Sequence, residues 1–378
     1  MYYTAARIFD GSDWRTGAIE TREGAVTGLV PKATFAEGPG HRHFGECVLV
    51  PAFVDAQVYG AGGRLFSAYP DSESLRVLAD HSWQGGAALV QPTVATNSPE
   101  VMRACIDAVR NYWKEGGEGI GGLHLEGPWI SPARRGAHPV AFIHPPTVEE
   151  ASELLAYGKG IIRTITLAPE QCGDDVLRLL LDAGIVLSAG HSDGSFAQSM
   201  RAFDSGFSTV THLYNAMSPL HHRAPGLLGA SLLHPGVCAS IIPDGHHVDF
   251  AALQIAQRAM GGRLFAITDA VTESGSGLYR HRYAAEGYFT SEGTLSGSAI
   301  TMNDAFQNLY RKVGIAATEV VRMCSTIPAR VFGWSAFGTI GPGTAANFLV
   351  FDKDWKLIER ISEPGSRTPA LCGAAHTG

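Results

Sequence analysis

The chain has 378 residues, of which 45% are hydrophobic and 17% charged, so it is long enough to bury a large core. Its formal net charge of −7 gives no indication of binding to nucleic acid or to an anionic membrane. Six scattered cysteines without a Cys-x-x-Cys pair, an N-terminus without a signal-peptide pattern and the lack of a long apolar run predict a cytoplasmic protein that spans no membrane.

The two ends of the chain have similar patterns. Residues 1–31 and 338–361 are short, turn-punctuated runs in which apolar and polar residues alternate, as is typical of antiparallel β-structure. Because domain termini tend to lie close together, we predict one small β-sandwich domain built from residues 1–50 and 338–378. The tail after Ile361 does not look like a closing strand, and we expect it to be disordered.

Residues 51–337 alternate short β-rich runs with amphipathic helical patterns. The eight strand candidates are 48–59, 87–95, 120–127, 161–169, 185–191, 208–213, 237–245 and 264–271. Helical patterns lie between them at 98–113, 174–184, 195–206 and 249–260, and the first begins with Ser-Pro. Eight βα units predict a (β/α)8 TIM-type barrel; an open doubly wound sheet is the alternative, but no Gly-x-Gly-x-x-Gly follows the first strand.

Four side chains with metal or acid–base chemistry fall at predicted strand ends: Glu126, His191, His212 and Asp269. Each has a simpler explanation alone, since such a histidine can be a hydrogen-bonded structural residue and such an aspartate a helix N-cap. In a barrel, however, all four converge on one mouth. Glutamate with two histidines is a common zinc set that leaves a position open for water, and a nearby carboxylate such as Asp269 can act as base and then acid.

Several motifs together resemble the N-acetylglucosamine-6-phosphate deacetylase family of the amidohydrolase superfamily. They are "GLHLEGPWISPARRGAHP", "AGHSDG", "THLYNAMSPLHHRAPGLLGA", "PDGHHVD", "ITDA" and "LSGSAITM", and the similarity runs from about residue 48 to 350. The resemblance implies a barrel with a small β-sandwich, commonly as a homodimer. It also implies hydrolysis of N-acetylglucosamine 6-phosphate to glucosamine 6-phosphate and acetate, with one divalent metal per subunit; zinc is expected, with iron, manganese or cobalt as alternatives.

The resemblance assigns roles residue by residue. It implies Glu126, His191 and His212 as metal ligands, Asp269 as catalytic acid/base, and His247 as the catalytic histidine near the acetyl carbonyl. The implied substrate contacts are Ala137, His138, Asn215, Ala216, Arg223, Asp244, Gly245, His246, His247, Leu295, Ser296 and Gly297. In the family the arginine at the position of Arg223 can reach the substrate of the neighbouring subunit.

One segment departs from the superfamily pattern. Many amidohydrolases carry His-x-His at the end of the first barrel strand, whereas this chain has "DAQVYG", with Gln57 and Tyr59 in those places. A neutral amide and a phenol are poor substitutes for two imidazoles, so we expect one tightly held metal, with Gln57 as a possible outer-shell partner.

Other functions stay open at this stage. The substrate can instead be N-acetylgalactosamine 6-phosphate or another N-acyl amine, and a non-catalytic sugar-phosphate sensor is a further alternative. The segment "PLHHRAPG", with His221, His222 and Arg223, suits phosphate binding but is equally consistent with a solvated loop. The segment "ISPARRGAHP" is either a lid, with His138 closing over the sugar, or a surface turn.

Overall fold

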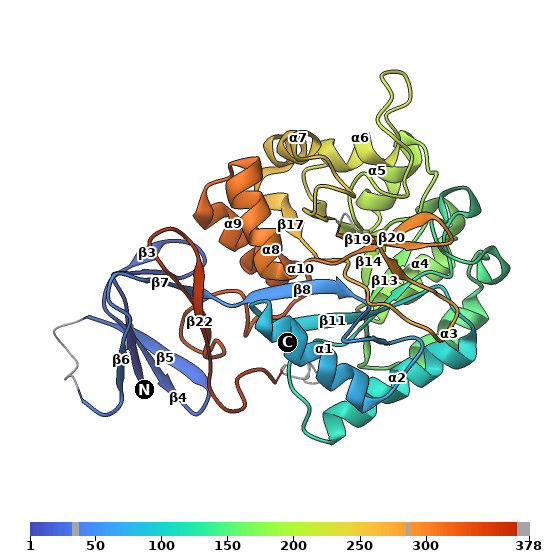
Figure 1. The fold of residues 1–378 in the computed structure, drawn as a ribbon. Helices are drawn as coiled ribbons and strands as arrows, with labels where there is room; N and C mark the ends of the chain where they lie inside the picture. Colours follow the sequence, from blue (N-terminus) through green and yellow to red (C-terminus); the bar gives the residue numbers. More distant parts are fainter. Residues whose placement is uncertain (32–37, 285–286, 369–378) are drawn as a thin grey trace.

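The computed structural model describes residues 1–31, 38–284 and 287–368. It consists of a helix-covered barrel and a smaller β-sandwich beside it (Figure 1). The predicted barrel with a sandwich built from both chain ends is therefore confirmed. Among the described helices, none is both long and apolar enough to cross a membrane.

Eight parallel strands form the barrel, in the sheet order β17-β16-β15-β14-β13-β12-β11-β8. They are β8 (Phe53–Val58), β11 (Ala87–Ala95), β12 (Leu123–Glu126), β13 (Ile162–Leu167), β14 (Val186–Ala189), β15 (Thr209–Val210), β16 (Cys238–Ile241) and β17 (Leu264–Ala266). Hydrogen bonds from Asp269 N to Gln57 O and from Tyr59 N to Ala270 O join the last strand segment to the first and close the ring. The strands are buried on both faces, which explains why they appear in the sequence as nearly continuous apolar runs.

The crossover helices begin where the sequence supplies capping residues. Helix α2 starts after Ser98, whose hydroxyl accepts from Val101 N, and Ser195 and Gln198 form a capping box at the start of α5. The helices are α1 (Ser72–Gln84), α2 (Pro99–Lys114), α3 (Val148–Tyr157), α4 (Asp174–Asp182), α5 (Phe196–Asp204), α6 (Gly226–Leu233), α7 (Phe250–Met260), α8 (Met302–Gln307), α9 (Ala317–Cys324) and α10 (Thr326–Val331). The four predicted helices correspond to α2, α4, α5 and α7.

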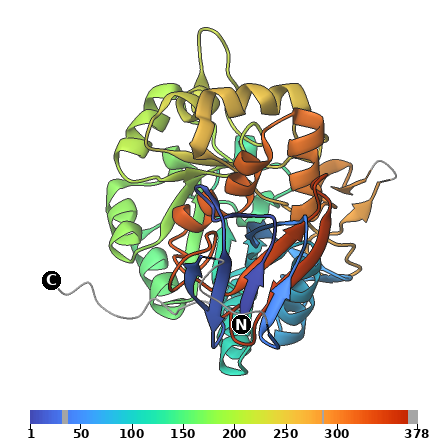
Figure 2. The same cartoon turned by 90° about the vertical axis from the view of Figure 1, so that its left-hand side faces the viewer.

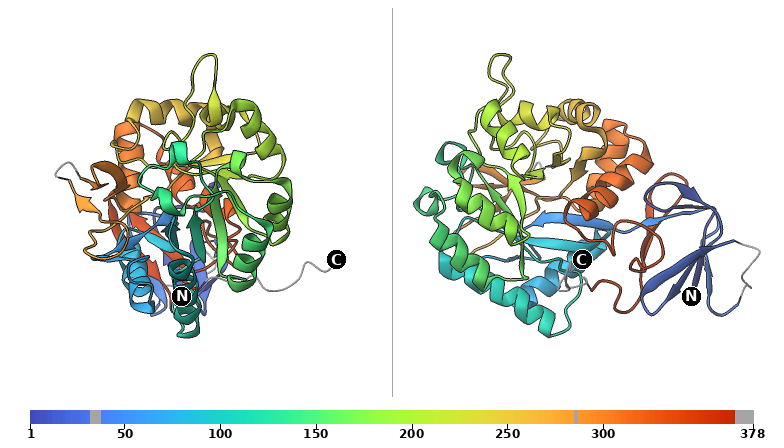
Figure 3. Two further views of the ribbon diagram at one scale, coloured as in Figure 1. Left: turned by 90° about the vertical axis from the view of Figure 1, so that its right-hand side faces the viewer. Right: turned by 180° about the vertical axis from the view of Figure 1, so that it is seen from behind.

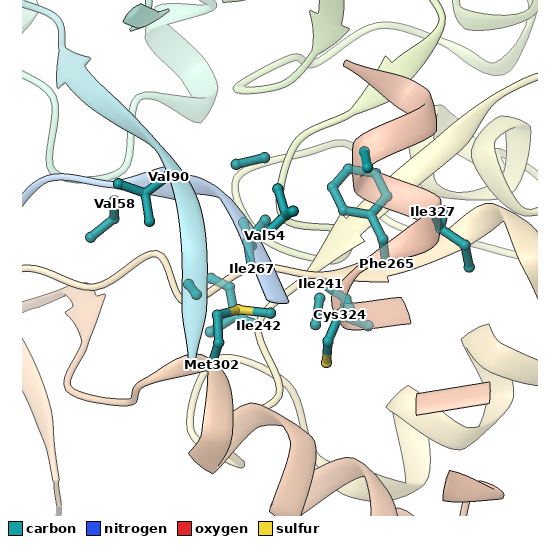
Figure 4. Packing of buried hydrophobic residues seen from close by; sticks show 14 of the residues in the cluster. Val54, Val58, Val90, Ile241, Ile242, Phe265, Ile267, Met302, Cys324 and Ile327 are labelled. Atoms are coloured by element: carbon teal, nitrogen blue, oxygen red, sulfur yellow. The ribbon is translucent and has the colours of Figure 1, made fainter. Parts of the chain in front are cut away.

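Helices α8 to α10 pack against the barrel strands. Figure 4 shows Met302, Cys324 and Ile327 from these helices close to strand residues such as Val54 and Phe265, and all five are at most 3% exposed. Through this contact the last three helices share the hydrophobic core of the barrel. Close packing there holds the strands in place, and the C-terminal ends of the same strands carry the polar site.

The β-sandwich consists of two sheets with strand orders β5-β4-β1-β6 and β22-β21-β7-β2-β3. Their bounds are β1 (Tyr2–Thr4), β2 (Arg7–Phe9), β3 (Trp14–Arg15), β4 (Ala18–Arg22), β5 (Ala25–Val30), β6 (His41–His43), β7 (Val48–Pro51), β21 (Asn347–Phe351) and β22 (Leu357–Ser362). Residues from both sheets, including Tyr3, Ile19, Leu49 and Phe348, share a separate buried cluster. Figure 2 shows blue N-terminal and red C-terminal strands side by side in this domain.

The sandwich lies at the N-terminal end of the barrel strands. Strand β7 belongs to the sandwich, and the chain runs from it directly into β8, which points to the opposite side (Figure 1). The single strand predicted over 48–59 is therefore wrong in one respect, because it divides into β7 and β8 in two different sheets. The left panel of Figure 3 faces the far end of the barrel, where the C-terminal ends of the strands open.

A three-stranded insertion covers part of this mouth. It contains β18 (Arg282–Tyr283), β19 (Tyr288–Ser291) and β20 (Thr294–Ser298), and the short hairpin β9 (Gly60–Ala61) and β10 (Arg64–Leu65) lies nearby. A third buried cluster, which includes Leu65, Val271 and Phe289, joins the insertion to the barrel. The insertion is thus a packed wall of the mouth.

The C-terminal tail is ordered further than its sequence indicates. Asn347 Nδ2 donates to Ser366 O, and Arg367 Nη2 donates to Ala79 O at 3.2 Å. The expected disorder is wrong for residues 362–368, because Ser362 ends strand β22 and these contacts tie the rest of the segment to both domains. Residues 369–378 lie outside the described residues.

Candidate metal and acid–base site at the barrel mouth

Glu126, His191 and His212 come together at the mouth of the barrel. Glu126 ends β12, and the two histidines follow β14 and β15, which are adjacent strands. Glu126 Oε1 lies 3.3 Å from His191 Nε2 and 3.0 Å from His212 Nε2, and the two Nε2 atoms are 3.1 Å apart. All three side chains are buried, and their three ligand atoms form a group that could hold a metal ion.

The geometry and chemistry of this group fit a small divalent cation. In a tetrahedral site with bonds near 2.1 Å, ligand atoms lie about 3.4 Å apart, close to the observed spacing. His191 Nδ1 is 2.9 Å from the Arg134 carbonyl oxygen, so Nδ1 carries the proton and the Nε2 lone pair faces the other two ligands. Two imidazole nitrogens in contact beside a buried carboxylate need a shared positive charge, which a bound cation would supply.

The backbone is held in an uncommon conformation at the same positions. His191, His212 and Asp269 have φ values of 47°, 33° and 53°, in the left-handed region that non-glycine residues rarely adopt. Such strain persists where the surrounding structure over-determines it, and it turns each side chain from the strand end into the mouth.

Gln57 and Tyr59 form a hydrogen-bonded support under the ligand carboxylate. Tyr59 Oη donates to Glu126 Oε2 at 2.5 Å, and Gln57 Nε2 lies 3.1 Å from Glu126 Oε1 and 2.7 Å from Asp269 Oδ1. Burial and the neighbouring carboxylates raise the pKa of Tyr59, so its phenol stays protonated and donates. In this chain, residues 57 and 59 therefore orient Glu126 and Asp269.

Asp269 stands beside the metal-binding group without belonging to it. It is buried, and this burial raises its pKa above the ordinary value, with the Glu126 charge acting in the same direction against the nearby histidines. A carboxyl group whose pKa is raised toward neutrality can exchange a proton during catalysis. Its geometry and electrostatics fit the predicted acid/base role.

His247 is oriented by Asp244. His247 Nδ1 lies 2.6 Å from Asp244 Oδ2, while the backbone N–H groups of His246 and His247 donate to Asp244 Oδ1 at 2.8 Å. Burial acts to raise the pKa of Asp244, but the hydrogen bond and charge of His247 with these N–H donors keep it below its usual value. The ionised carboxylate thus fixes the ring and leaves His247 Nε2 available to the mouth.

One cavity of about 370 Å³ connects these groups. The predicted site residues that line it are Glu126, Ala137, His138, His191, His212, Asn215, Ala216, His247, Asp269, Leu295 and Ser296. The predicted residues outside its lining are Gln57, Arg223, Asp244, Gly245, His246 and Gly297. Two residues of the latter group contact the lining from behind, since Asp244 hydrogen-bonds His247 and Gln57 hydrogen-bonds Asp269.

Two predicted contacts need a structural explanation. Arg223 is exposed on the loop between β15 and α6, which projects from the top of the molecule in Figure 1, so it does not reach the cavity of its own chain. Gly297 has φ 155°, and a Cβ there would lie 2.5 Å from the Val271 side chain, so it permits close packing behind the cavity wall.

His138 is held deep in the mouth. Its Nε2 lies 3.2 Å from Glu126 Oε2, and its Nδ1 is 2.7 Å from Thr96 Oγ1. Burial and the His191 charge lower the pKa of His138 to about 4, so it is neutral at physiological pH. The "ISPARRGAHP" segment is therefore anchored at His138 in the described structure.

Sequence reasoning missed several residues of the cavity wall. Ser67, Arg134, Tyr279, His281 and Thr294 all line it. None of them ends a predicted barrel strand, and Tyr279, His281 and Thr294 come from the insertion after β17. No periodic signal in the sequence connects this insertion to the mouth.

Known proteins share this sequence pattern and this architecture. Residues 48–373 match the amidohydrolase family. The chain belongs to that family. The resemblance predicted from the motifs is confirmed, and this amidohydrolase is a hydrolase that acts on an amide bond.

Relatives of this amidohydrolase align with it over most of its length. It is 33% identical to the N-acetylgalactosamine-6-phosphate deacetylase of Shewanella sp. (strain ANA-3), covering 90% of this chain and 89% of the relative. The Homo sapiens N-acetylglucosamine-6-phosphate deacetylase is also 33% identical, covering 93% and 91%. A solved Mycobacterium smegmatis N-acetyl-D-glucosamine-6-phosphate deacetylase variant, in complex with N-acetyl-D-glucosamine-6-phosphate, superposes with a TM-score of 0.87 at 29% identity, covering 98% of both chains.

A buried carboxyl group under the site makes stability depend on pH. Asp55 in β8 accepts from Thr268 N at 3.1 Å and from the Thr268 hydroxyl, and burial raises its pKa to about 7. The folded state then binds a proton that the unfolded state has lost, so the free energy of unfolding falls as pH rises from about 4 to 7.

We expect Asp55→Asn to remove this dependence, because an amide does not ionise. Between pH 5 and pH 8, urea unfolding should show the wild type losing about 3 kcal/mol relative to the variant. The metal content must be the same in both proteins. Parallel stability curves over this range would show that Asp55 does not titrate.

Proposed function

We propose that this chain hydrolyses N-acetylglucosamine 6-phosphate to glucosamine 6-phosphate and acetate. The observation that carries the proposal is the opening of the Glu126–His191–His212 group, Asp269 and His247 into one cavity. An amide hydrolase needs an activated water, a donor for the carbonyl oxygen and an acid for the departing amine, and these residues can provide all three. Five described cysteines are free, which suits a cytoplasmic enzyme.

Glu126, His191 and His212 would hold one divalent metal. When bound, such a cation supplies Lewis-acid chemistry that lowers the pKa of a water at the site from near 16 toward ~7. We propose zinc, because one carboxylate with two imidazoles suits its ligand preferences, while iron, manganese and cobalt are alternatives.

Asp269 moves the proton. Its carboxylate accepts a proton from the attacking water, and its buried position, which raises its pKa, favours the protonated form that the next step needs. Asp269 then donates the proton to the amide nitrogen, because an unprotonated amine anion is a poor leaving group. Gln57 keeps the Asp269 carboxylate in place through the 2.7 Å contact with Oδ1.

His247 stabilises the carbonyl oxygen. As negative charge develops there, the imidazolium form of the ring, whose Nδ1–H donates to ionised Asp244, presents its second N–H at Nε2 as a hydrogen-bond donor from the cavity wall. One well-placed donor of this kind is worth about 3 kcal/mol of transition-state stabilisation. Asn215 and Ala216 follow His212 directly and line the same cavity, so they are placed to contact the sugar.

The phosphate group needs a cation from outside the cavity. Among the described residues that line it, Arg134 is the one arginine or lysine, and its Nε is 2.7 Å from Asp193 Oδ1. We therefore propose a homodimer in which exposed Arg223 reaches the phosphate bound to the neighbouring subunit. An arginine suits this role because its planar donors match phosphate oxygens.

Replacement of Arg223 tests this arrangement. We expect Arg223→Ala to raise the KM for N-acetylglucosamine 6-phosphate about tenfold or more, with little change in kcat, because a charge-assisted hydrogen bond to phosphate is lost. The KM for unphosphorylated N-acetylglucosamine should not change. Steady-state kinetics measure both KM values, and an equal effect on both substrates would exclude a phosphate contact. Light scattering tests whether the protein is a dimer.

N-acetylgalactosamine 6-phosphate is the second candidate substrate. The Shewanella relative bears that name, and its identity to this chain is as high as that of the human enzyme. The two sugars differ only in the configuration at one ring hydroxyl, and both carry the acetamido group on which the proposed chemistry acts. Other N-acyl amines and a non-catalytic sensor are weaker alternatives, because Asp269 and the ligand set are intact.

Acetate release tests the proposed function. The purified chain is incubated with the two hexosamine 6-phosphates and with free N-acetylglucosamine, and its metal content is measured in parallel. We expect release from at least one sugar phosphate, fastest from the glucose epimer, at about one metal per chain. A metal-replete protein without turnover on either phosphate would refute the proposal.

A further inference from the structure

His281 has no role in the proposed chemistry, yet it lines the cavity. It lies just before β18, and its Nδ1 is 2.8 Å from Ser296 Oγ on β20. Its ring is parallel to that of Tyr279, with 6.0 Å between centroids and 5° between planes. Tyr279 in turn donates its hydroxyl to the Thr96 carbonyl at 2.8 Å, so the barrel itself holds this stack in position.

The His281 ring is neutral and has one nitrogen left over. Burial lowers its pKa to about 4, so the imidazole carries one N–H and one lone pair at physiological pH. Ser296 occupies Nδ1. Within the described residues, His281 Nε2 makes no hydrogen bond. It is not one of the fully buried side-chain nitrogen and oxygen atoms that lack a partner, so it is accessible from the cavity. A cavity-lining residue therefore retains an accessible polar atom.

Strand β20 carries Ser296, the hydrogen-bond partner of His281, and leads toward Asp269. Ser298 N donates to Asp269 O at 3.0 Å, which ties the end of β20 to the acid/base residue. Ser296 lies two residues earlier on the strand, roughly 7 Å away at the usual rise per residue. A sugar whose acetamido group is at Asp269 can thus extend along β20 toward His281.

We propose that His281 is a specificity-determining residue that hydrogen-bonds a ring hydroxyl of the N-acetylated hexosamine phosphate. This inference rests on the proposed function. A hydroxyl both donates and accepts, so it matches either tautomer of the ring, and Ser296 can adjust in the same way. A neutral imidazole offers no charge to a phosphate, which makes a hydroxyl the better complement.

The test compares His281 variants on substrates that lack single hydroxyls. We measure kcat and KM for N-acetylglucosamine 6-phosphate and for its 3-deoxy and 4-deoxy analogues. His281→Leu should lower kcat/KM for the parent about tenfold, mostly through KM, since a neutral hydrogen bond is lost and one partner is left unpaired. On the deoxy analogue that lacks the contacted hydroxyl, His281→Leu should cause no further loss of kcat/KM, because the hydrogen bond is already absent.

Two other variants complete the design. His281→Gln keeps a polar end and should recover part of the parent activity, and it allows the same substrate comparison if the leucine variant does not fold. Arg280→Ala is the matched control, because Arg280 is exposed and does not line the cavity. It should match the wild type on all three substrates, and metal content should be equal in all proteins.

Three results would overturn the inference and leave the proposed function intact. The first is a wild-type kcat/KM in both His281 variants, and the second is a loss of equal size on the parent and both deoxy analogues. A penalty that disappears only with unphosphorylated N-acetylglucosamine would also overturn it, since His281 would then contact phosphate. If the wild type releases no acetate from either hexosamine phosphate, the proposed function fails and the inference fails with it.

Discussion

Asp269→Asn should reduce kcat about 10³-fold, within the range expected for loss of a general acid and base. The amide cannot accept a proton from water or return one to the departing amine. Its oxygen can still accept from Gln57 Nε2, now 2.7 Å from Asp269 Oδ1, so the local structure should persist. Stopped assays of acetate release, with metal analysis of the same preparation, measure both quantities.

Retention of the metal in Asp269→Asn would show that the loss of turnover comes from the missing acid/base group and not from a missing metal. Asp269 lies outside the three-residue metal-binding group, so the variant should keep a wild-type metal-to-protein ratio and a wild-type melting temperature. Retention of most turnover would refute the acid/base assignment. Loss of the metal together with the activity would instead make Asp269 a ligand.

Glu126→Gln should weaken metal binding at least about 100-fold and abolish turnover with it. The substitution keeps the shape of the side chain but removes the negative charge of the carboxylate, whose Oε1 lies 3.0 Å from His212 Nε2. Loss of one outer-shell partner already costs about 10–100-fold in metal affinity, and loss of a charged ligand should cost more. It also changes the acceptor that Tyr59 uses at 2.5 Å. Competition with a chelator of known affinity measures the change.

Thermal stability gives a second readout of the same site. Metal at 100 times its dissociation constant stabilises the wild type by about 2.7 kcal/mol, and this increment should disappear in Glu126→Gln. Glu149→Gln in α3 is the control, because Glu149 is exposed and does not line the cavity, and it should behave as the wild type. Equal metal affinity in the two variants would exclude Glu126 as a ligand.

The sequence was sufficient to predict the barrel and the metal-binding group. Parallel strands bury both faces, so each one appears as an apolar run with a helical pattern after it, and eight such units can be counted. Since parallel strands end at one mouth, the polar residues that close these runs had to converge. Glu126, His191 and His212 are within 3.3 Å of one another for this reason.

The tail and the first strand show where local patterns failed. Residues 363–368 have no strand or helix periodicity, because their order comes from single contacts such as Asn347 Nδ2 to Ser366 O. Residues 48–59 form one apolar run in sequence, but the chain passes from one sheet to another within it. Periodicity reports burial, and it cannot report in which core a residue is buried.

The sequence by itself determined the fold class, the family and the residues that can bind a metal, because these depend on periodicity and on residue type at strand ends. Only the tertiary structure decided how those residues are supported. It placed Gln57 and Tyr59 between two carboxylates, kept Arg223 outside its own cavity, and brought His281 to Ser296 at the cavity wall. These outcomes depend on hydrogen bonds and packing between segments far apart in the chain, for which no local pattern exists.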